Sequence, residues 1–128
     1  MYFRMGGRNE KERYALQFTT VQHYLIEKCK GNKASSFFHN HNLRKIVLFG
    51  KTVLGECLQS DLADSDIQIL GKVDKCNSMD EIKNMIKNAD AVVLVDLFEL
   101  NNDIDFLLEN NLCQLQSIMN INDVIYNM

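Results

Sequence analysis

Short runs rich in apolar residues, of which 46–49 is apolar throughout, alternate with segments of helical periodicity in the second half of this chain. Three runs of strand length, at 46–49, 67–73 and 91–95, are rich in valine, isoleucine and leucine, and a fourth lies within 113–118. Between the runs, apolar residues recur every three or four positions, which is typical of an amphipathic helix. Continuous apolar runs are typical of strands that are covered on both faces.

Three helices and a final turn are predicted between and after these strands. The first helix covers 53–61, and its apolar side is formed by Val53, Leu54, Cys57 and Leu58. The second begins after Ser78, because Ser78 and Glu81 have the spacing of a capping box. Asn102 is the predicted N-cap of the third helix, and Asn122 that of the last turn.

The alternation of strands and helices predicts right-handed crossovers and therefore a parallel sheet. A single helix separates the second strand from the third, so the unit is shorter than a full mononucleotide-binding half. The predicted fold class is α/β: a trimmed Rossmann-like parallel sheet of about four strands in the order 2-1-3-4. Helices should cover both faces, and an N-terminal helical segment should precede the sheet.

The N-terminal segment carries its own helical pattern over 10–30, ended by Gly31 and Asn32. A short helix over 35–40 should bring two phenylalanines to the core. Apolar residues at i, i+4, i+7 and i+11 form one face of the long helix, namely Tyr14, Phe18, Val21 and Leu25, which Cys29 extends. This is more apolar surface than a lone helix can easily bury here, so we expect a homodimer built partly on it.

Length and charge narrow the possible classes of protein. A chain of 128 residues is one compact domain by size, here divided into a helical segment over 1–43 for oligomerisation or docking and a Rossmann-like unit over 44–128. The net charge of −3 argues against bulk binding of nucleic acid. No apolar run is long enough for membrane insertion, and no signal-peptide pattern is seen, so a cytoplasmic location is expected.

The charge is unevenly distributed along the chain. The first segment is basic, with Arg4, Arg8, Lys11 and Arg13, whereas 90–128 contains acidic residues and no lysine or arginine. Two interpretations stay open. Both stretches could be solvated surface, or the basic segment could dock on the acidic half, in the same chain or in a partner subunit. The four cysteines are scattered, and Cys57 and Cys113 are expected to be reduced, buried thiols.

A glycine turn between the first strand and its helix holds the main binding candidates. Gly50 and Gly55 match the first and third glycines of a dinucleotide-binding loop, but Thr52 replaces the second, which lets the backbone approach a pyrophosphate. Three interpretations stay open: retained binding of NAD or NADP, a smaller anion or shifted nucleotide held with Lys51, or a structural turn in which Thr52 caps the helix. Asp74 ends the next strand, where an acid accepts hydrogen bonds from ribose hydroxyls.

The other polar residues that could form a catalytic or metal-binding site give a weaker signal. Asp96 and Glu99 follow the third strand and could act as acid and base or hold a metal, or they could belong to an ordinary loop. His39 and His41 read as turn residues, with a metal site that includes His23 as the alternative. A complete oxidoreductase would need a Tyr-x-x-x-Lys pair or a histidine near the strand ends, and neither is found there. We assign no catalytic residue and no metal site.

Residues 14–126 resemble the small Rossmann-like, NAD(P)-binding-like domains associated with bacterial surface-polysaccharide and sugar-nucleotide biosynthesis. The resemblance is carried by Lys30-Gly31, Phe37-Phe38, the run 44–50, Leu54-Gly55, Val73-Asp74-Lys75, the run 90–95 and the run 121–126. The resemblance implies a fold and a genomic neighbourhood more than an activity. Because the catalytic residues of a complete enzyme are not found, the first hypothesis is an accessory module with a nucleotide-sensing or protein-interaction role and a larger biosynthetic enzyme as a possible partner. The alternatives are an NAD(P)- or nucleotide-sugar-binding oxidoreductase fragment and a purely structural oligomerisation domain.

Overall fold

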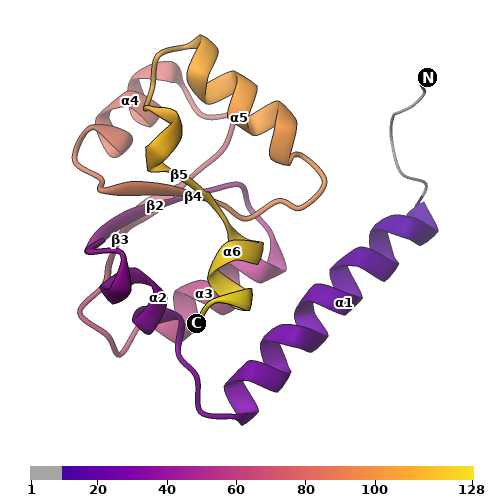
Figure 1. The fold of residues 1–128 in the computed structure, drawn as a ribbon. Helices are drawn as coiled ribbons and strands as arrows, with labels where there is room; N and C mark the ends of the chain where they lie inside the picture. The colour runs from indigo at the N-terminus through magenta and orange to yellow at the C-terminus, as the bar shows by residue number, and fades with distance from the viewer. Residues whose placement is uncertain (1–9) are drawn as a thin grey trace.

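A single parallel sheet forms the centre of the molecule (Figure 1). The computed structural model describes residues 10–128. The four strands lie in the order β3-β2-β4-β5, and each neighbouring pair is parallel. Their bounds are β2 Lys45–Phe49, β3 Gln68–Val73, β4 Ala91–Leu94 and β5 Ile118–Asn120. In chain order this is 2-1-3-4, so the predicted α/β fold is confirmed.

Helices cover both faces of the sheet because successive side chains of a strand point to opposite sides. Val47 and Phe49 of β2 face α4 (Met79–Lys87) and α5 (Leu100–Glu109), whereas Ile46 and Leu48 pack on the opposite side. That opposite side is covered by α1 (Glu10–Cys29), α2 (Ala34–Asn40), α3 (Val53–Leu62) and α6 (Ile121–Tyr126). β2 and β4 are therefore buried on both faces, as their continuous apolar runs predicted.

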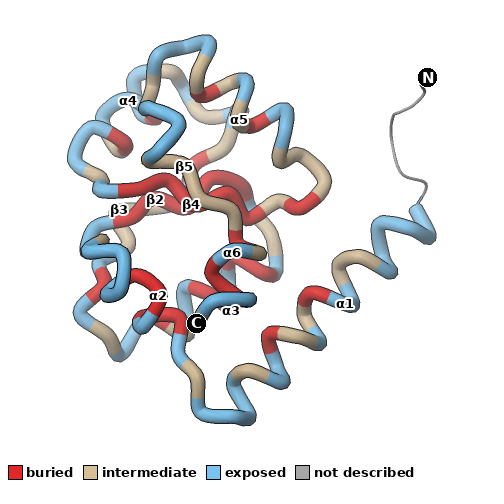
Figure 2. Tube along the Cα trace, viewed as in Figure 1, coloured by how far each residue is buried: buried red, intermediate tan, exposed pale blue. Residues whose placement is uncertain are grey.

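The long helix α1 lies along the side of this body and stays largely exposed (Figure 2). It ends where predicted, followed by Gly31 at φ +86°. Thr20 and Tyr24 are its buried residues, and the ring of His23 stacks on Tyr126 of α6 at 4.0 Å. The predicted apolar row instead lies on the neighbouring face of the helix, turned toward solvent: Tyr14, Phe18 and Leu25 are 63%, 67% and 61% exposed.

Several element boundaries differ from the sequence prediction near the end of the chain. The fourth strand is Ile118–Asn120, not 113–118, because the preceding residues form a 3₁₀ turn over Leu115–Ser117. Helix α6 is capped by Asn120, whose Oδ1 accepts the N–H of Asp123 at 2.9 Å, not by Asn122. Helix α5 begins before Asn102, whose side chain donates to Glu99 Oε2 instead of capping. The predicted capping box at Ser78 is confirmed.

Two apolar residues of α3 were predicted to be buried and are not. Val53 is 54% exposed, and Cys57 is exposed as well, because the sheet-facing row of this helix is Leu54, Leu58 and Leu62. Val53 and Cys57 precede members of that row by one position, which turns them toward α1. Cys113 is only partly buried. The prediction of buried thiols at Cys57 and Cys113 was therefore wrong for the first and only partly right for the second.

Candidate functional site

The sheet has a topological switch point between β2 and β4, since the crossovers from these strands lead to opposite sides of β2. In open α/β sheets, ligands bind outside the carboxyl ends of the strands at such a point. The loops after β2 and β4 flank a crevice of about 300 Å³ here. Its lining residues are Gln17, Lys51, Thr52, Val53, Leu54, Val95, Asp96, Leu97 and Phe98.

Thr52 is the N-cap of α3, as in one of the three interpretations that the sequence left open. Its hydroxyl oxygen accepts the N–H of Gly55 at 3.2 Å. The same hydroxyl donates to the carbonyl oxygen of Val95 at 2.8 Å, so one side chain ties the loop after β2 to the end of β4. The Gly55 N–H, which a phosphate could otherwise have bound, therefore already has an internal acceptor.

Gly50 and Gly55 both lie against Val95. Gly50 has φ +115°, which only glycine adopts without strain, and its N–H donates to the Val73 carbonyl at 2.7 Å. A Cβ at Gly55 would stand 3.1 Å from Val95 Cγ2. The tight turn and the close packing of helix on strand are thus the roles that these two glycines have in a dinucleotide-binding loop.

Lys51 and Asp74 approach each other at the same edge of the sheet. Lys51 Nζ lies 3.9 Å from Asp74 Oδ2, and the other carboxylate oxygen accepts the N–H of Cys76 at 2.8 Å. The fold thus gathers the five predicted residues, Gly50, Lys51, Thr52, Gly55 and Asp74, at the carboxyl ends of β2 and β3. Binding of NAD, NADP or another nucleotide by this group stays a prediction.

A buried carboxylate beside the crevice was missed by the sequence analysis. Asp103 of α5 is 3% exposed, and its Oδ1 lies 3.5 Å from Lys75 Nζ, which is also 3.7 Å from Glu99 Oε1. Burial raises the pKa of Asp103 to about 6, against the opposing effect of Lys75, while Asp96 and Glu99 add to the rise. The only sequence signal was an acid on the apolar face of α5, four residues before the buried Leu107.

The loop after β4 also meets α1. Asp96 Oδ1 accepts the N–H of Phe98 at 3.1 Å, and the guanidinium carbon of Arg13 lies 5.4 Å from the centre of the Phe98 ring. Arg13 is one member of the basic segment that was predicted either to be solvated or to dock on the acidic half. Arg4 and Arg8, from the same segment, lie outside the described residues.

The three histidines have separate partners and do not come together. His39 Nε2 contacts Asp66, which also pairs with Arg44 at the amino end of the sheet, and these contacts lower the pKa of Asp66. His41 Nδ1 lies 2.8 Å from the Phe37 carbonyl, and His23 stacks on Tyr126. Over residues 10–128, no group of three or more histidine, cysteine, aspartate or glutamate side chains has an arrangement that could hold a metal ion.

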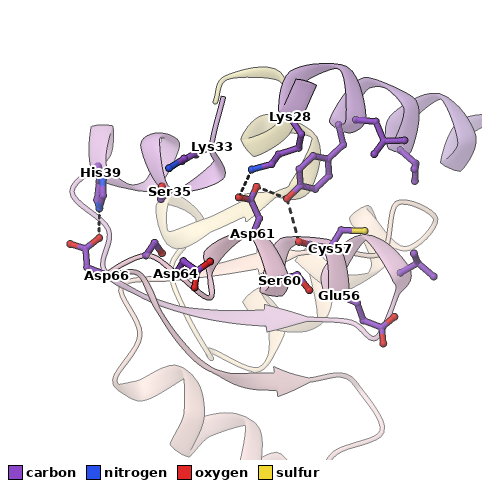
Figure 3. Close-up of a pocket in the computed structure, with 15 residues that line it drawn as sticks. Lys28, Lys33, Ser35, His39, Glu56, Cys57, Ser60, Asp61, Asp64 and Asp66 are labelled. Carbon is purple, nitrogen blue, oxygen red and sulfur yellow. Dashed lines mark hydrogen bonds and ion pairs between the residues drawn. The ribbon is translucent and has the colours of Figure 1, made fainter. Parts of the chain in front are cut away.

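A second, larger hollow lies between α1, α2 and α3 (Figure 3). This α1–α3 groove measures about 920 Å³, and Asp61 sits at its floor with a side chain that is 5% exposed. Asp61 accepts a hydrogen bond from the Tyr24 hydroxyl and pairs with Lys28 Nζ, each at 2.7 Å. Burial, and then the bond to Asp61, raise the pKa of Tyr24. This polar cluster fastens α1 to α3.

Comparison of the chain with protein-family models, with curated proteins and with solved structures gives no match. In the part of the chain that the structure describes, no helix combines the length and the apolarity needed to cross a bilayer. A functional proposal therefore rests on the geometry of the crevice and of the α1–α3 groove, together with the resemblance of residues 14–126 described above.

Proposed function

We propose that this protein is an accessory, non-catalytic Rossmann-like module that acts through protein contacts in a sugar-nucleotide or surface-polysaccharide pathway. The apolar row on α1 carries this proposal: Tyr14, Phe18 and Leu25 are each more than 60% exposed. Contiguous apolar patches on otherwise soluble domains mark interaction sites. A homodimer through α1 and a larger biosynthetic enzyme are the proposed partners, in the cytoplasm. The pathway itself rests on the resemblance alone.

The position of Tyr24 and Lys28 argues against a complete oxidoreductase. These two residues do have the Tyr-x-x-x-Lys spacing, but they lie in α1 and not near the strand ends. They contact Asp61 near the end of α3, however, whereas the phosphate-loop turn precedes its start, about 14 Å away along the helix. The raised pKa of Tyr24 is also the reverse of what a tyrosine acid near neutral pH needs.

A nucleotide-sensing role at the crevice is the second candidate. It is supported by Lys51, which directly precedes the N-cap of α3, and by Asp74, whose Oδ2 lies 3.9 Å from Lys51 Nζ. An anion is electrostatically favoured at such a helix N-terminus. Lys51 would contact a phosphate, and Asp74 would contact ribose hydroxyls. The internally bonded Thr52 hydroxyl weighs against a dinucleotide pressed onto the turn and leaves a smaller anion or a shifted nucleotide as the better fit.

A thermal-shift screen with NAD, NADP, coenzyme A, nucleotide sugars and inorganic phosphate separates these roles. A ligand that binds the folded state must raise the melting temperature, so a protein-contact module should give no ligand-specific rise. A rise that Lys51→Ala abolishes would favour nucleotide sensing. Calorimetric titration of wild type and Thr52→Gly with NAD and NADP then tests the turn. Low-micromolar binding by wild type that Thr52→Gly does not improve would favour the oxidoreductase fragment.

The third alternative, a purely structural oligomerisation domain, can be distinguished from an accessory module by the proteins that it binds. A purely structural domain should associate with itself and with no enzyme of the pathway. Co-purification of the wild-type protein with a glycosyltransferase or epimerase-type enzyme, lost on changing Phe18→Glu, would support the accessory role. Self-association without such a partner would support the structural alternative.

A further inference from the structure

The α1–α3 groove has an apolar side that nothing in the described chain covers. Val21 and Leu25 of α1 line it, together with Val53 and Cys57 of α3. Leu25 and Val53 are both more than half exposed. The apolar row of α1 continues from the groove through Phe18 to Tyr14, so the groove and the row form one surface.

This surface is large enough for an interface between two copies of the chain. A buried aromatic side chain contributes about 150–250 Å², so at the observed exposures Tyr14, Phe18, Leu25 and Val53 together offer on the order of 500 Å² per copy. Two copies would then bury on the order of 1,000 Å² of apolar area, the size at which a specific interface becomes plausible. Polar residues at the rim would add to this area.

The charges around the surface are self-complementary. Helix α3 and the turn after it carry only acidic charges, and Asp61 and Asp66 are already paired with Lys28, Arg44 and His39. Asp64 lines the same end of the groove, is exposed, and has no ion-pair partner among residues 10–128. Lys11, at the start of α1 and beside the apolar row, is likewise exposed and unpaired within the described chain.

The direction of α1 decides how two copies would fit. The α1 helix runs in the same direction as α3, since Gln17 shares the crevice with Val53 and Lys28 reaches Asp61 near the end of α3. An antiparallel second α1 would set Tyr14 beside Leu25 and Phe18 beside Val21. In the same register its first turn, with Lys11, would lie beside Lys28, at the end of the groove that also holds Lys33, Asp61 and Asp64. Lys28 is already paired with Asp61, which leaves Asp64 as the acidic group for Lys11.

We infer that a second copy of this chain occupies the groove. The two α1 helices lie antiparallel about a two-fold axis, and Lys11 of each copy meets Asp64 of the other. Such a pairing uses the same patch on both copies and therefore closes as a dimer. The inference rests on the proposed association through α1 and adds to it the orientation and the contacting groups. It holds whether or not the crevice binds a nucleotide.

Sedimentation analysis of purified full-length protein tests the association itself. Wild type should be dimeric at micromolar concentration, and Leu25→Glu should be monomeric at the same concentration. The variant should keep a single cooperative melting transition, at a lower temperature because the dimer no longer stabilises the folded state. Thr19→Glu is the matched control, because Thr19 is exposed on the same helix but faces away from the row. A monomeric wild type overturns the inference and leaves the groove to another protein. A dimer insensitive to Leu25→Glu overturns both the inference and the α1 homodimer.

A charge exchange tests the orientation. Lys11→Glu and Asp64→Lys should each raise the dimer dissociation constant on the order of tenfold, because each places like charges together twice per dimer. An equimolar mixture of the two variants should restore wild-type affinity, since the mixed dimer has opposite charges at both contacts. If Leu25→Glu dissociates the dimer but the mixture does not restore the wild-type dissociation constant, association through α1 stands and the antiparallel arrangement is wrong.

Discussion

The hydroxyl of Tyr24 donates a 2.7 Å hydrogen bond to the carboxylate of Asp61, and this contact joins α1 to the body of the protein. The same carboxylate pairs with Lys28 and accepts the N–H of Ala34, so it contacts both the end of α1 and the start of α2. Because this polar cluster positions α1, the helix does not need its apolar row for attachment. The row is left for other contacts.

Removing the Tyr24 hydroxyl should weaken this attachment. Tyr24→Phe keeps the ring in place but deletes a buried hydrogen bond to a charged group, and we expect a loss of about 1.5–3 kcal/mol in the free energy of unfolding. Urea denaturation measures it. Tyr14→Phe on the exposed side of the same helix is the control and should change stability by less than about 0.5 kcal/mol. Equal effects of the two variants would show that the Tyr24–Asp61 contact does not hold α1.

Thr52 should be replaceable by serine but not by alanine. Thr52→Ala removes the cap on Gly55 and the donor to Val95, and it should cost about 1–2 kcal/mol of stability. Thr52→Ser retains the hydroxyl and should lie within about 0.5 kcal/mol of wild type. Chemical denaturation at neutral pH compares the three proteins. A serine variant as unstable as the alanine variant would assign the stabilisation to the methyl group instead.

A methyl group at Gly55 should be costlier than one at Gly71. At Gly55 a Cβ would lie 3.1 Å from buried Val95, whose β-branched side chain has little freedom to move. At Gly71 it would meet the Sδ of Met85, a flexible side chain at the edge of the core that can move aside. We expect Gly55→Ala to lower stability by about 1–3 kcal/mol and Gly71→Ala by less. The reverse order in thermal melts would contradict this packing argument.

Asp103 should make the protein less stable as the pH rises. Burial raises its folded-state pKa to about 6 from 3.8, so its stabilising contribution is fully present below 3.8 and is lost as the pH rises through 6. Asp103→Asn removes this titration. The stability of the variant relative to wild type should therefore increase between about pH 4 and pH 7, by at most about 3 kcal/mol.

Urea denaturation of wild type and Asp103→Asn at several pH values measures this difference. Comparing the two proteins cancels the opposite trends of carboxylates with lowered pKa values, such as Asp66 and Asp90. Asp105→Asn, at an exposed position of the same helix, should run parallel to wild type. A relative stability of Asp103→Asn that stays flat with pH would mean that Asp103 titrates as an ordinary surface carboxyl group.

The sheet could be predicted from the sequence because each strand is specified by the pattern of apolar residues within its own few positions. The runs that form β2 and β4 are apolar at every position, and burial on both faces requires that pattern. The caps at Thr52 and Ser78 were equally predictable, since each bonds to a backbone N–H three residues ahead. The gathering of Lys51 and Asp74 followed from strand order alone, because carboxyl ends of parallel strands share one edge.

What the sequence did not reveal depends on residues far apart in the chain. Helical periodicity placed Tyr14, Phe18 and Leu25 on one face but could not show that the neighbouring face, with Tyr24, docks on Asp61. Asp103 is buried and pairs with Lys75, which comes from another loop. The predicted position of the short strand β5 was a few residues too early. Its position is decided by pairing with β4, in which Ile118 lies opposite Val92, and the local sequence does not contain this information.

The stacking of His23 on Tyr126 also bears on how the protein is made. It joins α1 to α6, the first and the last elements of the described chain, so α1 cannot complete its packing during synthesis until the final helix has left the ribosome. Contacts between distant segments close late, after the local structure between them has formed. Throughout that interval the face of α1 that carries His23 is open to water in addition to the apolar row, so α1 can contact neighbouring nascent chains before folding is complete.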